Sequence, residues 1–295
     1  QQIMAFYACW WLGAVAVPVC ECLGDLETAF ILRDSEPKLI LVDPSVLERI
    51  EELAGDEPVL PFSELNDCVG APVPEGQVVP EDDTAALIYT SGSTGMPKGV
   101  MLTHRNFFAN AASSIAMIQI RNDDTIMSLL PYWHCFALVV EVLISMMSGA
   151  GVITPKDKRD FVKNIGNYAP SVILVVPRIA DALMNGILRK AGESAPSRRR
   201  LFEAALRNAE QVLNEDPGLS GALYRRVAHA AFYSPVVFAK VRKSFGGRLR
   251  FIVSGGAPLD LRPQLFFKYL GIPIMQGYGL TESTPVISCN PLENH

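Results

Sequence analysis

Short apolar runs of strand length recur along this chain of 295 residues, with helix-like stretches between them. The runs are rich in Val, Ile and Leu, which favours strands buried on both faces of a parallel sheet. These runs are 38–43, 85–90, 125–130, 150–155, 171–176, 249–254 and 272–277. The stretches 104–118 and 261–270 have helical periodicity, and Thr103 and Asp260 stand where helix N-caps are expected. This alternation predicts a layered α/β/α architecture.

A long, mainly helical insertion at about 179–245 interrupts that alternation. Residues 196–250 contain eleven Lys and Arg against four Asp and Glu, although the whole chain has a net charge of -5. A solvated helical face explains this basic surplus, and a surface for phospholipid or an anionic cofactor is the alternative. The acidic total gives no reason to expect nucleic acid as a partner.

The composition, 49% apolar and 19% charged, indicates a globular protein and not a disordered one. The six cysteines are scattered and form no CxxC pair, so neither a zinc site nor a disulfide framework is expected. A reducing, cytoplasmic location is the simplest account of these cysteines.

Two stretches of low charge could be mistaken for membrane spans, residues 1–20 and residues 125–155. The first contains Pro18 and changes from a helical to a strand-like pattern. The second is interrupted by Pro131, His134 and a Ser-Gly-Ala-Gly turn. Both are therefore expected to be buried core elements.

The segment 90–99 has the composition of a phosphate-binding loop. Hydroxyl groups and glycines crowd residues 90–95, and glycine lets consecutive amides point at one anion. Lys98 adds a mobile positive charge, while Pro97 and Gly99 keep the segment from forming a helix. The loop follows a predicted strand, where open α/β sheets usually contact ligands. A flexible Ser/Gly linker is the alternative, but a proline and a lysine between two apolar strands argue against it.

Two well-known phosphate motifs do not fit this segment. A P-loop needs Gly-Lys followed by Ser or Thr that runs into a helix, whereas Lys98 stands between Pro97 and Gly99. The dinucleotide pattern GxGxxG is also missing from it. Kinase-type and NAD-type chemistry are therefore disfavoured.

The stretch YTSGSTGMPKGVMLTHRN (89–106) resembles the signature loop of the adenylate-forming superfamily, which includes acyl- and aryl-CoA synthetases. Further stretches agree in the order that this family shows, and the resemblance covers nearly the whole chain. They are LPYWHCF (130–136), VPRI (176–179), LRFIVSGGAPL (249–259) and GIPIMQGYGLTES (271–283). The helical insertion and its exit GGRLRFIVSGGAPL (246–259) are similar to long-chain fatty acid–CoA ligases.

This resemblance implies a reaction in two halves, with ATP, Mg²⁺ and coenzyme A as cofactor and co-substrates. A fatty acid carboxylate attacks the α-phosphorus of ATP to give acyl-AMP and pyrophosphate, and the CoA thiol then displaces AMP. The site must neutralise charge because carboxylate and triphosphate repel each other.

The resemblance also assigns roles to individual residues, with Lys98, His134, Thr281 and Glu282 expected to be catalytic. The phosphates would be held by Thr90, Ser91, Gly92, Ser93, Thr94, Gly95, Lys98 and Thr281. The adenine would lie against Gly255, Gly256, Ala257, Gln276, Gly277, Tyr278 and Gly279. The acyl substrate would contact Trp133, His134, Phe136, Gly277 and Leu280. Mg²⁺ would be bound by Glu282 and Thr94.

Five of these side chains also have a simpler structural explanation. His134 can be a packed histidine instead of a residue that orients the carboxylate or senses the adenylate. Trp133, Phe136 and Tyr278 can be core aromatics, and Glu282 can be an ordinary carboxylate at a helix start.

The domain expected from the resemblance is a partial AMP-binding domain over 1–295, truncated at both ends and without the C-terminal lid domain. The ribose-binding acidic residue and the lid lysine of the family are not found before His295, so little ligase turnover is expected. Transfer to a carrier protein, or a non-catalytic nucleotide- or acyl-binding module, are the alternative functions. The apolar stretches and the basic insertion permit peripheral membrane association. Acyl chain length and oligomeric state cannot be read from the sequence.

Overall fold

The computed structural model describes residues 1–68, 75–91, 95–214 and 226–291. The chain forms two compact units. Unit 1 comprises Gln1–Asn110, Pro131–Val139 and Thr281–Pro285, and unit 2 comprises Ala111–Leu130, Val140–Leu280 and Val286–His295.

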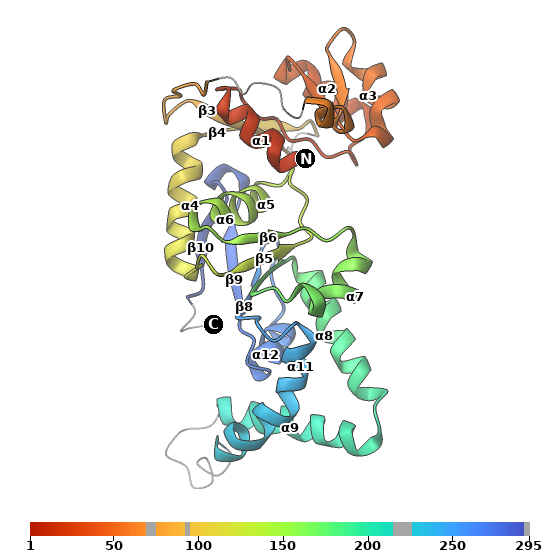
Figure 1. The fold of residues 1–295 in the computed structure, drawn as a ribbon, viewed down its shortest axis with the longest axis vertical. Helices are drawn as coiled ribbons and strands as arrows, with labels where there is room; N and C mark the ends of the chain where they lie inside the picture. The colour runs from red at the N-terminus through yellow and green to blue at the C-terminus, as the bar shows by residue number, and fades with distance from the viewer. Residues whose placement is uncertain (69–74, 92–94, 215–225, 292–295) are drawn as a thin grey trace. The chain divides into compact units, whose positions relative to one another are not determined.

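Unit 2 is built on a six-stranded sheet with the strand order β10-β9-β8-β7-β5-β6 (Figure 1). Five of the strands are parallel: β5 (Thr125–Ser128), β6 (Gly151–Ile153), β7 (Val172–Val175), β8 (Phe251–Ser254) and β9 (Ile274–Gly279). Each lies within or overlaps an apolar run in the sequence, so this part of the prediction is confirmed. The last strand, β10 (Val286–Cys289), is antiparallel to β9 and was not predicted.

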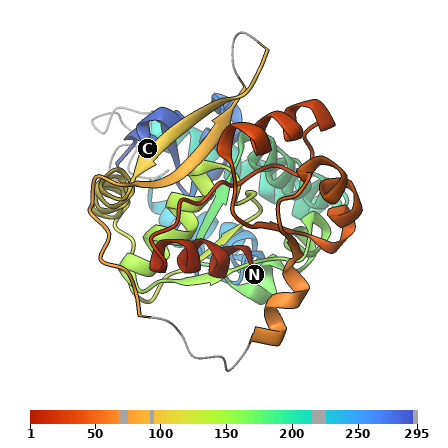
Figure 2. The same cartoon turned by 90° about the horizontal axis from the view of Figure 1, so that it is seen from above.

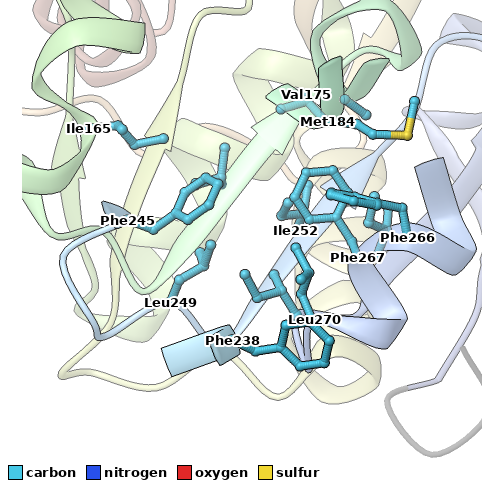
Figure 3. Packing of buried hydrophobic residues seen from close by; sticks show 14 of the residues in the cluster. Ile165, Val175, Met184, Phe238, Phe245, Leu249, Ile252, Phe266, Phe267 and Leu270 are labelled. Carbon is cyan, nitrogen blue, oxygen red and sulfur yellow. The ribbon is translucent and has the colours of Figure 1, made fainter. Parts of the chain in front are cut away.

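Helices of unit 2 share a buried core with this sheet. They are α7 (Lys158–Tyr168), α8 (Pro177–Gly192), α9 (Pro196–Asn214), α11 (Ala239–Ser244) and α12 (Leu261–Tyr269). A buried cluster joins them to the strands, and Figure 3 shows Phe238, Phe245, Phe266 and Phe267 within it. Burial of each such aromatic ring stabilises the fold by about 2 kcal/mol. The layered α/β prediction is therefore confirmed for this unit.

The insertion is mainly helical, as expected. It comprises α8, α9, the π-helix η4 (His229–Phe238) and α11. Helix α8 begins at Pro177, a first helical position where the missing N–H of proline is not needed. The wide turn of η4 continues directly into α11.

A polar cluster ties together the amino ends of β5, β7 and β8. Asp124 is 3% exposed and accepts hydrogen bonds from the hydroxyl of Ser171 at 2.7 Å and the N–H of Arg121 at 2.8 Å. The Arg250 guanidinium forms an ion pair with the same carboxylate. Burial favours a raised pKa of Asp124, but these hydrogen bonds and the Arg250 charge outweigh burial and lower that pKa.

Unit 1 contains two small sheets. Strands β1 (Ile40–Val42) and β2 (Val59–Pro61) are parallel, and β3 (Thr84–Thr90) pairs with β4 (Lys98–Thr103) as an antiparallel hairpin. Figure 2 shows this hairpin in orange and yellow. The runs 38–43 and 85–90 are therefore strands, but their expected place in the large parallel sheet was wrong. Strand β3 pairs with the next strand in sequence, because seven residues suffice to connect antiparallel neighbours.

Helical segments complete unit 1. They are α1 (Gln2–Trp11), α2 (Asp25–Ser35), η1 (Pro44–Val46), α3 (Leu47–Ala54) and η2 (Phe62–Cys68). Helix α4 (His104–Ile118) matches the predicted helix at both ends and runs from unit 1 into unit 2. Its N-terminus is capped by Thr103 and Asn106, whose side chains accept each other's backbone N–H at 3.2 and 3.0 Å.

The two stretches of low charge are divided into short elements. Residues 125–155 contain β5, α5 (Cys135–Ala137), the π-helix η3 (Leu138–Leu143), α6 (Ile144–Ser148) and β6. Within the described ranges, no helix has both the length and the apolar character that crossing a bilayer requires.

One expectation about the cysteines was wrong. Cys20 and Cys22 form a disulfide across a single residue. Their Cα atoms are 5.2 Å apart, which lies in the usual range for disulfides. One residue separates the two cysteines, so they do not have CxxC spacing. Cys9, Cys135 and Cys289 are free thiols.

Candidate functional site

The predicted phosphate loop lies at the tip of the β3–β4 hairpin in unit 1. Thr90 at the end of β3 pairs with Lys98 at the start of β4, so the loop connects two paired positions of the hairpin. Ser91 and Lys98 are exposed, and no ion pair holds Lys98 among the described residues. Gly95 has a φ of +93°, a conformation that glycine adopts without strain. The predicted residues Gly92, Ser93 and Thr94 lie outside the described residues.

Side chains next to the tip of the hairpin fix its position in unit 1. The hydroxyl of Tyr89 donates a 2.6 Å hydrogen bond to Asp34 on α2. Burial and this carboxylate raise the pKa of Tyr89, so the phenol stays protonated. Opposite Tyr89, a Cβ added to Gly99 would lie 2.8 Å from Leu87 Cδ1. Glycine after the lysine therefore permits close strand packing at this point.

A short turn that carries Glu282 packs against the same hairpin. The 3₁₀ turn η5 (Thr281–Ser283) contacts β4, and the Asn110 side-chain amide donates a 3.2 Å hydrogen bond to the Ser283 carbonyl. The turn ends at Thr284, which is buried and has a φ of +64°. A buried threonine in this region is strained and is retained only where its surroundings fix it. The fold thus brings η5 to the strand that begins at Lys98.

The Glu282 carboxylate in η5 suits Mg²⁺, which needs few protein ligands, better than it suits a metal that needs three or four. Glu282 is exposed, and it forms no ion pair with any other described residue. Within those residues, no group of three or more His, Cys, Asp and Glu could hold a metal ion. Mg²⁺ characteristically takes one or two carboxylates together with substrate phosphates and waters. Of the two predicted ligands, Thr94 lies outside the described residues.

The predicted adenine residues lie at the carboxyl ends of two neighbouring strands of unit 2. Ser254 at the end of β8 pairs in register with Gln276 in β9, so the loop 255–257 lies beside the end of β9. Gly256 has a φ of +81°, and the N–H of Gly255 donates to the Val175 carbonyl at 3.2 Å. This edge is where open α/β sheets bind ligands.

The aromatic and apolar side chains at this edge are available to a ligand. Tyr278 is 64% exposed, which argues against its being a core aromatic. Leu280 is 42% exposed, and Gly279 between them is also exposed. The loop after β8 carries Gly255, Gly256 and Ala257, and the neighbouring strand β9 carries Gln276, Gly277, Tyr278 and Gly279.

His134 precedes α5 in unit 1, and its ring lies beside that of Trp133. The two ring centroids are 3.7 Å apart, and the backbone N–H of His134 donates to the Pro131 carbonyl at 3.1 Å. Partial burial lowers the pKa of His134, which favours the neutral imidazole. Phe136 is half-buried. A neutral imidazole keeps one N–H donor, which suits contact with an anionic substrate.

An apolar groove in unit 2 was not predicted from the sequence. It has a volume of about 570 Å³ and lies between α8, α9 and α12. Its lining is Met184, Leu188, Leu206, Arg207, Glu210, Leu261, Arg262, Leu265, Phe266 and Tyr269. The i, i+4 spacing of apolar residues on α8 and α12 was a signal in the sequence. That spacing could not reveal that part of each apolar face remains uncovered.

Residues 1–295 match the family described as AMP-binding enzyme. Long-chain-fatty-acid–CoA ligase 2 of Schizosaccharomyces pombe is 32% identical over 247 residues, which cover 81% of this chain and 34% of that protein. Long chain acyl-CoA synthetase 8 of Arabidopsis thaliana is 28% identical over 321 residues, 96% of this chain and 44% of that protein. The chain therefore spans less than half of the length of either curated relative.

Solved structures share the fold. Apo MatB from Rhodopseudomonas palustris superposes with a TM-score of 0.72 at 21% identity, over 100% of this chain and 50% of that one. MenE, the O-succinylbenzoate coenzyme A synthetase from Bacillus subtilis, in complex with AMP, gives a TM-score of 0.70 at 24% identity, over 99% of this chain and 61% of that one. At these identities the likeness concerns the fold alone.

Proposed function

Because this chain belongs to the AMP-binding enzyme family, we propose that it is the nucleotide- and acyl-binding part of a long-chain fatty acid–CoA ligase. The reaction activates a fatty acid with ATP to acyl-AMP and pyrophosphate. The thiol of CoA then attacks the acyl carbon, AMP leaves, and acyl-CoA is formed.

The observation that carries this proposal is the contact between β4 and η5 in unit 1. Lys98 opens β4, and Glu282 lies in η5, far away in the sequence. Both side chains are exposed, and neither has an ion-pair partner among the described residues. An ammonium group and a carboxylate on adjoining elements suit a magnesium–polyphosphate complex, because one binds phosphate and the other binds the metal.

In the first half-reaction the hairpin loop neutralises the phosphates. Lys98, the hydroxyls of Thr90 and Ser91 and the loop amides bind the β- and γ-phosphates and then the leaving pyrophosphate. This reduces the repulsion that the attacking carboxylate meets at the α-phosphorus. Thr281 offers its hydroxyl to the α-phosphate in this proposal.

Glu282 holds Mg²⁺ in this proposal, and the bound metal supplies charge neutralisation at the phosphates. The other assignments follow the family resemblance. The adenine contacts the loop 255–257 and the end of β9, and His134 donates a hydrogen bond to the substrate carboxylate. Trp133, Phe136, Gly277 and Leu280 contact the acyl group.

The groove between α8, α9 and α12 supports a long aliphatic substrate. Its volume of about 570 Å³ lies in the range of about 300–1,000 Å³ that small-molecule sites occupy. Most of its lining is leucine, methionine and aromatic side chains, which favour a hydrocarbon chain over a polar acid. We assign the distal part of the acyl chain to this groove.

The proposal includes a cytoplasmic location with peripheral membrane association. The free thiols of Cys9, Cys135 and Cys289 suit a reducing compartment, whereas the Cys20–Cys22 disulfide gives that assignment no support. Long-chain fatty acids partition into bilayers, and the basic surplus of 196–250 suits an anionic membrane surface.

Binding of ATP to the chain, with and without Mg²⁺, tests the phosphate and metal assignments. Lys98→Ala is expected to weaken Mg-ATP binding about tenfold, the effect of losing one charge-assisted hydrogen bond. Glu282→Gln is expected to raise the Mg²⁺ concentration needed for half-saturation, with little effect on binding without metal. The matched controls Lys158→Ala and Glu57→Gln, both at exposed positions, should change neither value.

ATP–pyrophosphate exchange in the full-length gene product tests the reaction and its substrate. Exchange should require a fatty acid and rise with chain length. Leu265→Trp should fill the groove and lower the activity with palmitate more than with a short-chain acid. Exchange that needs no carboxylate, or that is equal for short and long acids, would contradict the proposal. Acceptor assays with CoA and a carrier protein separate the two ligase types.

A further inference from the structure

The helical segment 226–244 has two faces with different surroundings. The inner face packs into the core of unit 2 through Val237 and Phe238, with Tyr233 and Val241 against the same cluster. The outer face carries large apolar side chains that are open to solvent: Val227 (54% exposed), Phe232 (45%) and Val236 (41%). These three recur every four to five residues, close to the turn of a π-helix, so they share one face.

This outer face is also basic. Arg226, Lys240 and Lys243 are exposed, and none has an ion-pair partner in the described part of the chain. By contrast, Arg242 on the inner face is used structurally, since it donates to the Leu270 carbonyl at 2.8 Å and the Ser234 carbonyl at 3.0 Å. The sequence 226–259 contains no Asp or Glu, so no carboxylate of the segment offsets these charges.

We propose that the exposed face of the helical segment 226–244 is a docking surface for an anionic phospholipid bilayer. Val227, Phe232 and Val236 enter the boundary between headgroups and acyl chains, while Arg226, Lys240 and Lys243 contact lipid phosphates. Apolar side chains at this boundary, together with neighbouring cations on lipid phosphates, are the contacts that hold surface-bound helices on anionic membranes. This inference rests on the peripheral membrane association proposed above and names the surface that performs it.

Charge decides between the alternative occupants of this face. A second copy of the chain would bring two basic faces together, and like charges oppose such a contact. An acidic protein has the right charge, but it would need a pocket that is complementary to the apolar side chains. This face offers only three such side chains, arranged in a single row. A bilayer accepts such a row without needing a complementary pocket. An anionic membrane therefore fits both properties.

Co-sedimentation with vesicles tests the proposal. The probes are vesicles of phosphatidylcholine alone and of phosphatidylcholine with about one quarter phosphatidylserine. Wild-type chain should bind the anionic vesicles, and added salt should weaken the binding. Because each basic residue at a membrane surface contributes about fivefold in affinity, Lys240→Glu with Lys243→Glu should reduce binding at least tenfold. Phe232→Ser with Val236→Ser should reduce binding to the same vesicles without changing its salt dependence.

The matched control is Lys158→Glu with Lys163→Glu on α7, which makes the same change in charge at exposed positions outside the basic region 196–250. The control should retain most of the binding. Equal losses in the control and in the α11 variant would overturn the assignment of this surface, as would unchanged binding in both η4 and α11 variants. If the wild type binds polyglutamate but not anionic vesicles, the partner of this surface is an acidic protein, and the proposal is overturned.

Two further measurements separate this inference from the proposed function. Thermal unfolding of each variant shows whether the fold is retained. Mg-ATP binding of the η4 and α11 variants should equal that of the wild type, because these residues are outside the nucleotide assignments. Loss of Mg-ATP binding in the wild type, with vesicle binding intact, would contradict the proposed function and leave the docking surface standing.

Discussion

Replacing Asp124 by alanine removes the acceptor that joins the amino ends of three strands of unit 2. The Asp124 side chain is 2% exposed and that of Arg250 is 22% exposed. The substitution leaves the Arg250 guanidinium, the Ser171 hydroxyl and the Arg121 N–H without their acceptor. Breaking a buried pair by removing one partner costs about 3–5 kcal/mol. Arg250 can still reach water, so we expect the low end of this range, about 3 kcal/mol.

Thermal unfolding followed by circular dichroism measures this change. For a unit of this size, a loss of about 3 kcal/mol lowers the midpoint by roughly 6–12 °C. The pKa of Asp124 is lowered in the folded state, so its ionised form stabilises the fold above its unfolded pKa of about 3.9. That stabilisation is lost as the pH falls through the lower folded pKa. The difference between wild type and Asp124→Ala should therefore shrink below about pH 4.

The matched control is Asp82→Ala. Asp82 also forms an ion pair with an arginine, Arg105 at 2.7 Å, but its side chain is 74% exposed. Solvent screening makes exposed pairs contribute little, so the midpoint should not change measurably. An Asp124→Ala midpoint within 2 °C of the wild type, or a difference that persists undiminished well below about pH 4, would refute the reasoning.

Three shorter predictions concern backbone space, the η5 turn and the histidine. Gly246→Ala should destabilise unit 2 by at least about 3 kcal/mol, because its Cβ would overlap the backbone of a residue at the end of α7 and its φ is +87°. Gly247→Ala, where φ is +76° and no atom lies within 4 Å of the added Cβ, should cost only conformational strain of about 1–2 kcal/mol. Equal chemical denaturation midpoints for Gly246→Ala and Gly247→Ala would contradict this difference. Asn110→Ala should raise the Mg²⁺ requirement of ATP binding, as Glu282→Gln does, because the Asn110 amide holds the η5 turn; rescue of this requirement by Asn110→Gln but not by Asn110→Leu would separate positioning from packing. In an NMR titration, the midpoint of His134 should lie below the ordinary value of about 6.5, and a midpoint above it would contradict the effect of burial.

Local elements with strong, self-sufficient patterns could be predicted from the sequence. Helix α4 begins and ends where its periodicity and its Thr103 cap indicate. The apolar runs at 171–176 and 249–254 contain the central strands β7 and β8, whose residues are all buried. Such runs need burial on both faces whatever their neighbours are, so composition alone reveals them.

Which strands pair with each other was harder to predict from the sequence. Strand β3 has the same apolar character as β7, yet it belongs to a hairpin in unit 1. Strand β10 was missed because it is short and mixed in burial, and its pairing with β9 supplies what its sequence lacks. Propensity describes one segment, whereas pairing depends on which other segment is present at the right distance.

The sequence by itself identified Lys98 and Glu282 as candidates for phosphate and metal chemistry, because both stand in motifs that resemble those of the adenylate-forming superfamily. Only the tertiary structure decided that β4 and η5 adjoin, since their contact joins segments about 180 residues apart in a folded unit. The groove between α8, α9 and α12 and the exposed face of η4 were decided in the same way. Apolar spacing gives a helix a face to bury, and it is the packing of the remaining chain that covers that face or leaves it open.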